Sequence, residues 1–531
     1  MKNINQLSIA LVTFILMLTT QSCEKFITHD NPQGVTDALW WNTETDAKAA
    51  LKTVYAGIPA GTSGRNVMYF SGMSDEAVDR GDFKGAYDLF TRSLQDTRWA
   101  VALSIWTDDY IDIRRANRFL ENVDKVYMDE AVKTRMKYEA RALRAYYHME
   151  LMLLFGDIPL VTHSVLPNDN NLSRNPSSEV YSFIVSELTD CAQNLPTEYV
   201  TAEAWRISSG ACWALLSRLA LYSKDYELAK KATLEIINSN VYQLYKSTKS
   251  NGDSYAELFG YTGELNKERI FYSENGCGSA WTTLAPVGIG GETYISPTNT
   301  VVDNYETKQG NTIYELGADS MAIYRKYPNY HNNRDPRLEA SVFYPGENFQ
   351  GKYILDPFYN NTDKIGATKS TATGYWVQKY IDPLDQAAKK GTLDFMIIRY
   401  AEVLLNYTEA LVELGDWQNP DVLKYLNEVR NRARMPSVQT FKYNTQDKLR
   451  TLIRRERQAE LAFEGQRYFD IRRWGIVNDV MNGDVYGATN PQTGEIAKVQ
   501  TRVYNLNRDF LWPIPQTEID ANPNMTQNPK Y

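Results

Sequence analysis

The chain has 531 residues, with 57 Lys and Arg against 65 Asp and Glu, which gives a net charge of −8. Its 43% hydrophobic and 23% charged residues exclude a mainly disordered protein. The negative charge and the lack of a long Lys/Arg run argue against sequence-independent nucleic-acid binding. The 36 Tyr, 18 Phe and 11 Trp suggest a surface that stacks on a ligand, unless core packing absorbs most of the rings.

The N-terminus is predicted to be an export signal. Lys2 precedes an apolar run, LSIALVTFILML at residues 7–18, which is too short to span a bilayer and typical of a signal-peptide core. The small residue Ser22 precedes Cys23, as at a lipoprotein cleavage site. Residues 1–22 are therefore predicted to be removed and Cys23 to be acylated. A secreted protein with an incidental Cys at this position is the alternative.

The body of the chain is predicted to be mainly α-helical. Residues 130–155 place apolar side chains on one helix face and end before Gly156 and a following Pro. Two helical pairs follow, at 205–222 with 225–238 and at 398–414 with 421–433. Both resemble tetratricopeptide hairpins, which bury their apolar faces by stacking on neighbours.

An irregular insert at residues 245–395 interrupts the helices. It is rich in Gly, Asn, Thr, Tyr and Pro, and residues 276–301 are predicted to be a loop. Loops of this size in a compact protein are functional or disordered, and the aromatic residues within this one favour function.

No catalytic residue, metal site or cofactor is predicted. Cys277-Gly278-Ser279-Ala280-Trp281 resembles a cysteine-protease signature, but His331 is the only later His and comes too early, so we interpret the match as chance. The chain has no CxxC motif and no Cys/His cluster that could hold zinc. No pair of carboxylates stands out as a glycosidase dyad.

Residues 454–475 (RRERQAELAFEGQRYFDIRRWG) are predicted to form internal ion pairs. Glu456, Glu460 and Glu464 are four residues apart and would repel one another on one helix face. Arg457 and Arg467 lie three residues from Glu460 and Glu464, close enough to offset this repulsion. A structural role is favoured over ligand binding.

Several segments, in order along nearly the whole chain, resemble the SusD/RagB family of outer-membrane lipoproteins. Residues 454–475 match its signature, and FLWPIPQTEIDANPNMTQNPKY (510–531) resembles its closing pattern. Its helices and connecting segments are matched by LWWNTETDAKAALKTVYAGI (39–58), ARALRAYYHMELMLLFGDIPLV (140–161), NNRDPRLEASVFYPG (332–346), RYAEVLLNYTEAL (399–411) and LNEVRNRA (426–433).

The resemblance implies one mainly α unit with about four tetratricopeptide-like hairpins and an irregular ligand-binding part. Its N-terminal part would be residues 23–240, and its C-terminal part 241–531, in which final helices and tail follow the insert from residue 396. The family is anchored at the outer membrane by lipid, here through Cys23, and faces the exterior. It caps a SusC-like TonB-dependent transporter as a lid, captures glycan, or peptide in some members, and performs no catalysis.

Ligand contacts in the family come from the region after the first helix and from the mid-chain insert. Exposed Trp and Tyr would stack on sugar faces, while Asp, Asn and Arg would bind hydroxyls. The residues that suit these roles are Trp281, Tyr294, Tyr69, Asp75, Arg80 and Phe83. Trp281 is the first candidate because its loop lacks helical periodicity, and a buried loop anchor is its alternative. The rival function is a helical-repeat adaptor that binds a partner's peptide in its hairpin groove.

Overall fold

The computed structural model describes residues 40–62, 66–80, 87–165, 171–326 and 329–531. The predicted signal peptide at residues 1–22, the predicted lipid site Cys23 and the candidate ligand residue Phe83 lie outside these ranges.

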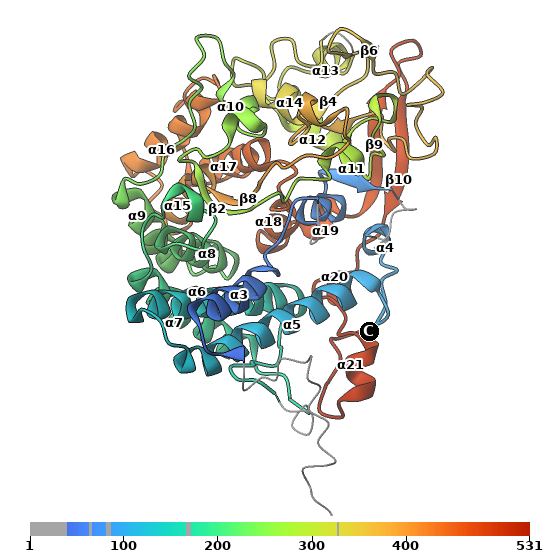
Figure 1. The fold of residues 1–531 in the computed structure, drawn as a ribbon. Coiled ribbons are helices and arrows are strands. Elements are labelled where there is room, and N and C mark those ends of the chain that lie inside the picture. Colours follow the sequence, from blue (N-terminus) through green and yellow to red (C-terminus); the bar gives the residue numbers. More distant parts are fainter. Residues whose placement is uncertain (1–39, 63–65, 81–86, 166–170, 327–328) are drawn as a thin grey trace, which may run out of the picture.

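The molecule is mainly α-helical, as predicted, and its longer helices pack in series from the lower half of the molecule up its left side (Figure 1). These helices are α3 (Glu44–Tyr55), α5 (Ala100–Asn122), α6 (Glu130–Phe155), α7 (Ser177–Asn194), α8 (Ser209–Tyr222), α9 (Tyr226–Ser239), α15 (Tyr400–Glu413), α16 (Pro420–Arg432) and α17 (Gln446–Leu461). Each helix from α5 to α9 packs on the next, α9 packs on α15, and α15 packs on both α16 and α17.

The predicted helix ends agree with the structure within a few residues. Helix α6 covers the predicted 130–155, with the Asp129 carboxylate accepting from two backbone N–H groups at its start and Gly156 at a φ of 77° after its end. Helix α8 begins four residues later than predicted because the Ser208 side chain caps it. Asp225 caps α9, and Pro420 occupies the first turn of α16.

Short elements form the rest of the molecule. Most of them lie in the upper half of Figure 1, whereas the C-terminal segment returns beside α5 at the lower right. The short helices are α4 (Asp88–Thr91), α10 (Ser254–Glu257), α11 (Ala280–Leu284), α12 (Asn299–Asn304), α13 (Ala318–Tyr324), α14 (Pro336–Ser341), α18 (Arg467–Arg473), α19 (Val477–Val480), α20 (Leu506–Asp509) and α21 (Gln516–Ala521). Antiparallel strand pairs join β1 (Ala77–Asp79) to β3 (Ile295–Pro297), β2 (Arg269–Ser273) to β8 (Phe395–Arg399), β4 (Val342–Phe343) to β7 (Trp376–Val377), β5 (Asn348–Phe349) to β6 (Tyr353–Ile354), and β9 (Gly483–Thr489) to β10 (Ile496–Arg502).

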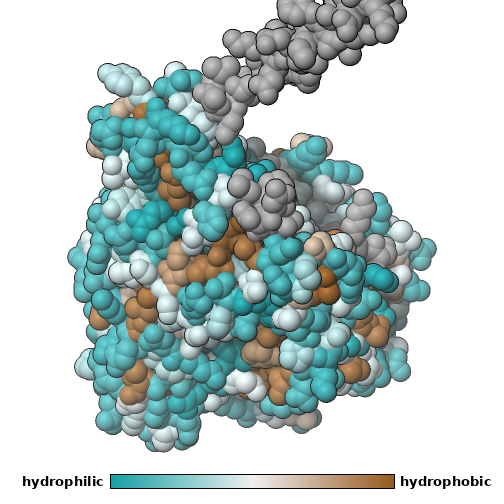
Figure 2. Space-filling view, turned by 90° about the horizontal axis from the view of Figure 1, so that it is seen from below, coloured by the Kyte–Doolittle hydropathy of each residue, from teal (hydrophilic) through white to brown (hydrophobic). Residues whose placement is uncertain are grey.

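One large hydrophobic cluster connects the two halves of the chain. The C-terminal tail returns to α6, where the backbone N–H of Trp512 donates to the Leu154 carbonyl at 2.9 Å. The indole of Trp512 is fully buried and donates to the Tyr468 hydroxyl at 2.8 Å. The face of the molecule seen from below is mostly hydrophilic, with narrow hydrophobic stretches (Figure 2). No helix within the described ranges combines the length and the apolar composition that crossing a bilayer requires.

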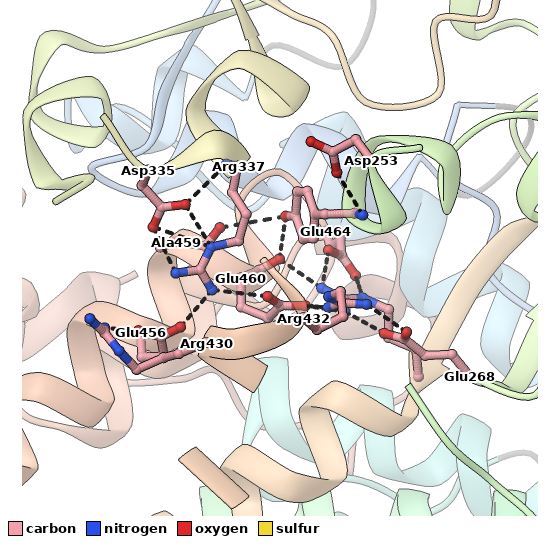
Figure 3. Close-up of polar contacts among 12 residues, drawn as sticks. Asp253, Glu268, Asp335, Arg337, Arg430, Arg432, Glu456, Ala459, Glu460 and Glu464 are labelled. Carbon is pink, nitrogen blue, oxygen red and sulfur yellow. Dashed lines mark hydrogen bonds and ion pairs between the residues drawn. The ribbon is translucent and has the colours of Figure 1, made fainter. Parts of the chain in front are cut away.

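A buried network of charged side chains joins α17 to the short elements (Figure 3). Glu456 accepts from Arg337 of α14 at 2.6 Å, and Glu460 accepts from Arg399, at the end of β8, at 2.6 Å. Burial opposes ionisation of Glu460, but Arg432, Arg399 and Arg337 together hold its pKa well below the usual range. The predicted internal ion pairing of this segment is therefore confirmed.

The partners within this network differ from those predicted. Arg457 pairs with Asp470 at 3.1 Å, and Arg467 pairs with Asp75 at 2.7 Å. Helix α17 ends at Leu461, and Phe463 has a φ of 62°, so Glu464 and Arg467 do not lie on one helix. Sequence spacing predicts side-chain neighbours only while the helix continues.

Candidate functional site

The pairing of β1 with β3 brings two predicted ligand residues together. In its register Asp79 lies opposite Ile295, and the next residue, Arg80, donates its backbone N–H to the Tyr294 carbonyl at 2.9 Å. The Arg80 guanidinium lies over the Tyr294 ring, 4.9 Å from its centroid, and also donates to the Glu292 carbonyl. Both side chains are half-buried. These residues are 214 positions apart in sequence, so only the strand pairing could reveal their contact.

Among the described residues, Tyr294 forms the half-buried end of a row of aromatic rings. Its centroid is 6.1 Å from that of Tyr69, which is 6.3 Å from Tyr87, and Tyr87 is 6.2 Å from Phe70. We call Tyr294, Tyr69, Tyr87 and Phe70 the aromatic row. Burial is the main cause that raises the pKa of Tyr69 and Tyr87, so their hydroxyls are neutral at physiological pH.

Charged groups surround the exposed end of this row. Glu292 accepts from Lys369 Nζ at 2.6 Å and from the Tyr294 hydroxyl at 3.2 Å. The hydrogen bond from Lys369 is the main cause that lowers the pKa of Glu292. The half-buried Arg80 and Glu292 and the exposed Lys369 therefore place two cations and one anion around a phenol ring. We call these three residues the charged rim.

A cleft of about 570 Å³ opens at the other end of the aromatic row. Its lining includes Phe70 and Tyr87 together with residues of α5. Its polar lining comes from Asn66, Ser104, Asp108, Asp112, Arg115 and Glu150. Aromatic rings and hydrogen-bonding groups in one lining match the amphipathic surface of a sugar.

Trp281 is not part of this surface, and its predicted exposed position is wrong. The side chain is only 1% exposed, in the short helix α11 rather than a loop. Its indole N–H donates to the Ile289 carbonyl at 3.2 Å, and its ring packs edge-on against Phe349. Trp281 is therefore a buried anchor for the turn that leads to Tyr294, which agrees with the alternative considered from the sequence.

The turn from Pro286 to Thr293 depends on glycine. A Cβ on Gly291 would lie 2.1 Å from the Ala285 carbonyl oxygen, and Gly290 has a φ of 99°. The Thr293 hydroxyl donates to that same carbonyl at 3.1 Å, and the Tyr294 N–H donates to the Thr283 carbonyl at 2.7 Å. These contacts fix the position at which Tyr294 leaves the turn.

Asp75, predicted to bind ligand hydroxyls, instead lies in a buried ion pair. Its two oxygens accept from Arg467 Nε and Nη2, both at 2.7 Å, and the residue is 6% exposed. This bidentate pair attaches the segment before β1 to α18. The structure thus brings together Tyr69, Arg80 and Tyr294, and separates Asp75 and Trp281 from the surface.

Sequence reasoning missed Glu292, Lys369, Tyr87 and Phe70. Glu292 lies two residues before Tyr294, and Phe70 follows Tyr69, so proximity in sequence could have indicated both. Lys369 reaches the site only through the folding of the insert and carried no sequence signal.

The arrangement of rings and charged groups is suited to binding. Burial raises the pKa of the Cys277 thiol, which disfavours the thiolate that a nucleophilic cysteine requires. Among the residues that the structure describes, no group of His, Cys, Asp and Glu could hold a metal ion.

Comparison with known proteins gives matches along the chain. The family model described as "SusD family" matches residues 244–531, and one described as "Starch-binding associating with outer membrane" matches residues 34–221. SusD-like protein P38 from Formosa agariphila is 25% identical across 100% of both chains. Starch-binding protein SusD from Bacteroides thetaiotaomicron is 25% identical over 79% of this chain and 77% of its own.

The crystal structure of a SusD-like carbohydrate binding protein from Bacteroides fragilis has the same fold, with a TM-score of 0.83 and 29% identity. It covers 92% of this chain and 100% of that one. A second SusD-like protein from Bacteroides fragilis gives a TM-score of 0.81 at 26% identity, covering 94% of this chain and 99% of that one.

Proposed function

Because the chain belongs to the SusD family, we propose that it is a cell-surface lipoprotein that captures oligosaccharide or polysaccharide without cleaving it. It would then act as a lid that delivers the glycan to a SusC-like TonB-dependent transporter in the outer membrane. The names of its relatives, which include a starch-binding and a carbohydrate binding protein, support the ligand class.

The observation that carries this proposal is the aromatic row, with the charged rim at one end and the 570 Å³ cleft at the other. Sugar C–H groups pack on the open part of the Tyr294 ring, while Arg80, Glu292 and Lys369 exchange hydrogen bonds with hydroxyls. Each such contact contributes little, so binding is weak at one sugar and strengthens along a chain.

Titration calorimetry against a panel of polysaccharides and oligopeptides tests the proposal. We expect at least one glycan to bind, and Tyr294→Ala and Arg80→Ala to weaken it by about fivefold or more, because stacking and charged hydrogen bonds are each worth about 1–3 kcal/mol. Tyr127→Ala is the matched control, since Tyr127 is 93% exposed and distant from the row in sequence. Binding of peptides alone would support the peptide-binding alternative within the family.

Point variants, and not a deletion of the loop at residues 276–300, distinguish the glycan-binding function from the helical-repeat adaptor. Removing residues 276–300 would delete Trp281, Ile289 and strand β3 from the core, so loss of binding would report unfolding. The point variants of Tyr294 and Arg80 avoid this problem. The helical-repeat adaptor is the better account under two conditions. The parent protein retains a protein partner and no glycan, and the Tyr294 and Arg80 variants retain that partner equally well.

The anchor and the lid have separate tests in cells. We expect Cys23→Ser to abolish labelling by a palmitate analogue and to release the protein from the outer membrane. We also expect the lipidated chain to co-purify with a large TonB-dependent barrel. Co-purification that fails under mild detergent would contradict the lid role and leave glycan binding intact.

A further inference from the structure

A second large cleft lies at the junction of α6, α7, α8, α18 and the C-terminal tail. The ring of Phe469 in its lining lies 6.0 Å from that of Phe70, at the buried end of the aromatic row. The volume of this second cleft is about 670 Å³. Three arginines line it, Arg174, Arg472 and Arg473, whereas Asp157 is the only acidic residue in its lining. A positive cleft on a chain with a net charge of −8 points to an anionic ligand. We call it the arginine cleft.

One of the three arginines is neutralised within the protein. Arg473 donates to Glu409 at 2.6 and 2.8 Å and to Asp470 at 2.8 Å. Within the part of the chain that the structure describes, neither Arg174 nor Arg472 has a carboxylate within 4.0 Å.

Arg472 carries a buried charge without a counter-charge. It is 7% exposed, its Nη groups donate to the carbonyls of Leu153 and Phe510, and its Nε has no hydrogen-bond partner. The rings of Tyr468 and Phe510 lie 4.9 and 4.7 Å from the guanidinium carbon. A buried charge is costly without an opposite charge, and an anion in the cleft would supply one.

Arg174 is half-buried and donates to carbonyl and amide oxygens, among them the Asp157 carbonyl at 2.7 Å and Asn528 Oδ1 at 2.6 Å. Burial lowers the pKa of this guanidinium below its ordinary value, and the nearby Asp157 only partly opposes the shift. The carbonyls at the end of α6 accept from both arginines, and the negative end of that helix offsets at most about half a unit charge.

The start of α7 also lines the cleft, and the Asp157 carboxylate offsets the positive end of this helix. This helix has 18 residues and begins at Ser177, whose backbone N–H donates to Asp157 Oδ1 at 2.7 Å. Ser178 is exposed at the second position of the helix and lines the cleft. Among the described residues its hydroxyl donates to none, so it is available to a ligand.

A stacked aromatic pair forms another wall of the cleft. Tyr222 and Phe469 lie with their centroids 5.3 Å apart and their planes at 12°, and both rings are half-buried. A sugar ring packs on such a platform, as on the ring of Tyr294.

We propose that the arginine cleft is a second saccharide site, which binds a carboxylate or sulfate group of an anionic glycan through Arg174, Arg472 and Ser178, with the sugar ring against Tyr222 and Phe469. The proposal rests on the proposed function, because it takes glycan binding as given and adds a charged class of glycan in a second cleft.

The test uses calorimetry with the lipid-free mature chain and matched probes: a neutral oligogalactose, an oligogalacturonate and a sulfated oligogalactose of equal length. We expect the anionic probes to bind at least tenfold more tightly than the neutral one at low salt, and this advantage to shrink in 0.5 M NaCl. The carboxylated and sulfated probes distinguish the two anionic groups.

Three variants locate the binding. We expect Arg174→Gln to reduce the affinity for the anionic probes about tenfold and to leave the neutral probe unchanged. Ser178→Asp should abolish the anionic advantage while stabilising the start of α7, since an acidic residue suits a first helical turn. Arg434→Gln is the control, because Arg434 is exposed and likewise donates to a backbone carbonyl.

Equal affinity for neutral and anionic probes would overturn the proposal. An anionic advantage that survives both Arg174→Gln and Ser178→Asp would also overturn it. A third contradicting result is a loss of thermal stability in Arg174→Gln without a change in affinity, because the arginines would then serve only as caps of α6. The proposed function has its own outcome in these experiments. If the neutral probe binds and Tyr294→Ala abolishes that binding, the proposed function stands even where the arginine cleft fails.

Discussion

At the scale of single residues, burial separates the residues that can touch a ligand from those that hold the surface in place. Trp281 and Tyr294 are 13 positions apart on one short segment, yet the first is sealed in the core and the second is half-buried. The indole hydrogen bond and two glycines fix the turn between them.

Trp281→Phe should therefore lower stability without removing a ligand contact. We expect a loss of about 1–3 kcal/mol in the free energy of unfolding, since a large buried ring is truncated. The affinity of the folded protein for its glycan should stay within twofold. Denaturant unfolding and calorimetry measure the two effects. A tenfold loss of affinity at unchanged stability would return Trp281 to the ligand site.

The buried carboxyl group of Glu76 should make the free energy of unfolding depend on pH. Burial raises its pKa from 4.5 to about 8, although Arg467 opposes the shift. Between these two values the unfolded chain releases the Glu76 proton and the folded chain keeps it, so stability falls as the pH rises from about 5 to 8.

We expect Glu76→Gln to reduce this fall and to raise the unfolding midpoint at pH 8, because the amide cannot ionise and can still accept from the Phe463 N–H. Thermal unfolding at several pH values measures it. Identical pH profiles for the variant and the parent would contradict the assigned cause.

At the scale of elements, α17 is a helix whose buried glutamates, Glu456 and Glu460, are neutralised by arginines from other elements. Glu460 alone accepts from Arg337, Arg399 and Arg432. Glu460→Gln should cost about 3–5 kcal/mol, because it leaves buried cations without their partner. Glu428→Gln, on the exposed face of α16, should change stability by less than about 0.5 kcal/mol. A comparable effect in both variants would contradict the network's role.

Long periodic helices could be predicted from the sequence, and the contacts that build the candidate site could not. The 3.6-residue repeat and the Gly-Asp stop of α6 located that helix correctly. In contrast, Arg80 meets Tyr294 through the three-residue pairing of β1 with β3, which is too short to leave a periodic pattern. The prediction for Trp281 was wrong because its Gly-rich neighbourhood suggested an exposed loop. The large apolar indole is instead buried in the core.

At the scale of the whole molecule, the C-terminal tail closes the structure against the helical stack. Asn528 is 3% exposed, and its amide donates to the carbonyls of Phe155 at 2.9 Å and Trp512 at 2.7 Å, while its oxygen accepts from Arg174. These bonds join the tail, the end of α6 and the arginine cleft.

Asn528→Ala should lower stability by about 2–4 kcal/mol, since it leaves buried polar groups unpaired. Asn194→Ala, at the exposed end of α7, is the matched control and should have little effect. Chemical denaturation measures both variants. A tail that contributes nothing to the core would show no difference between them.

The central claim is that glycan binds on the open surface formed by Tyr294, Arg80 and Lys369. A crystal structure of the mature chain with the tightest-binding neutral oligosaccharide of the panel tests it directly. We predict a sugar ring against Tyr294, with its hydroxyls within hydrogen-bond distance of Arg80 and Lys369. Density for the sugar only in a groove of the helical stack, with the aromatic row empty, would contradict the account.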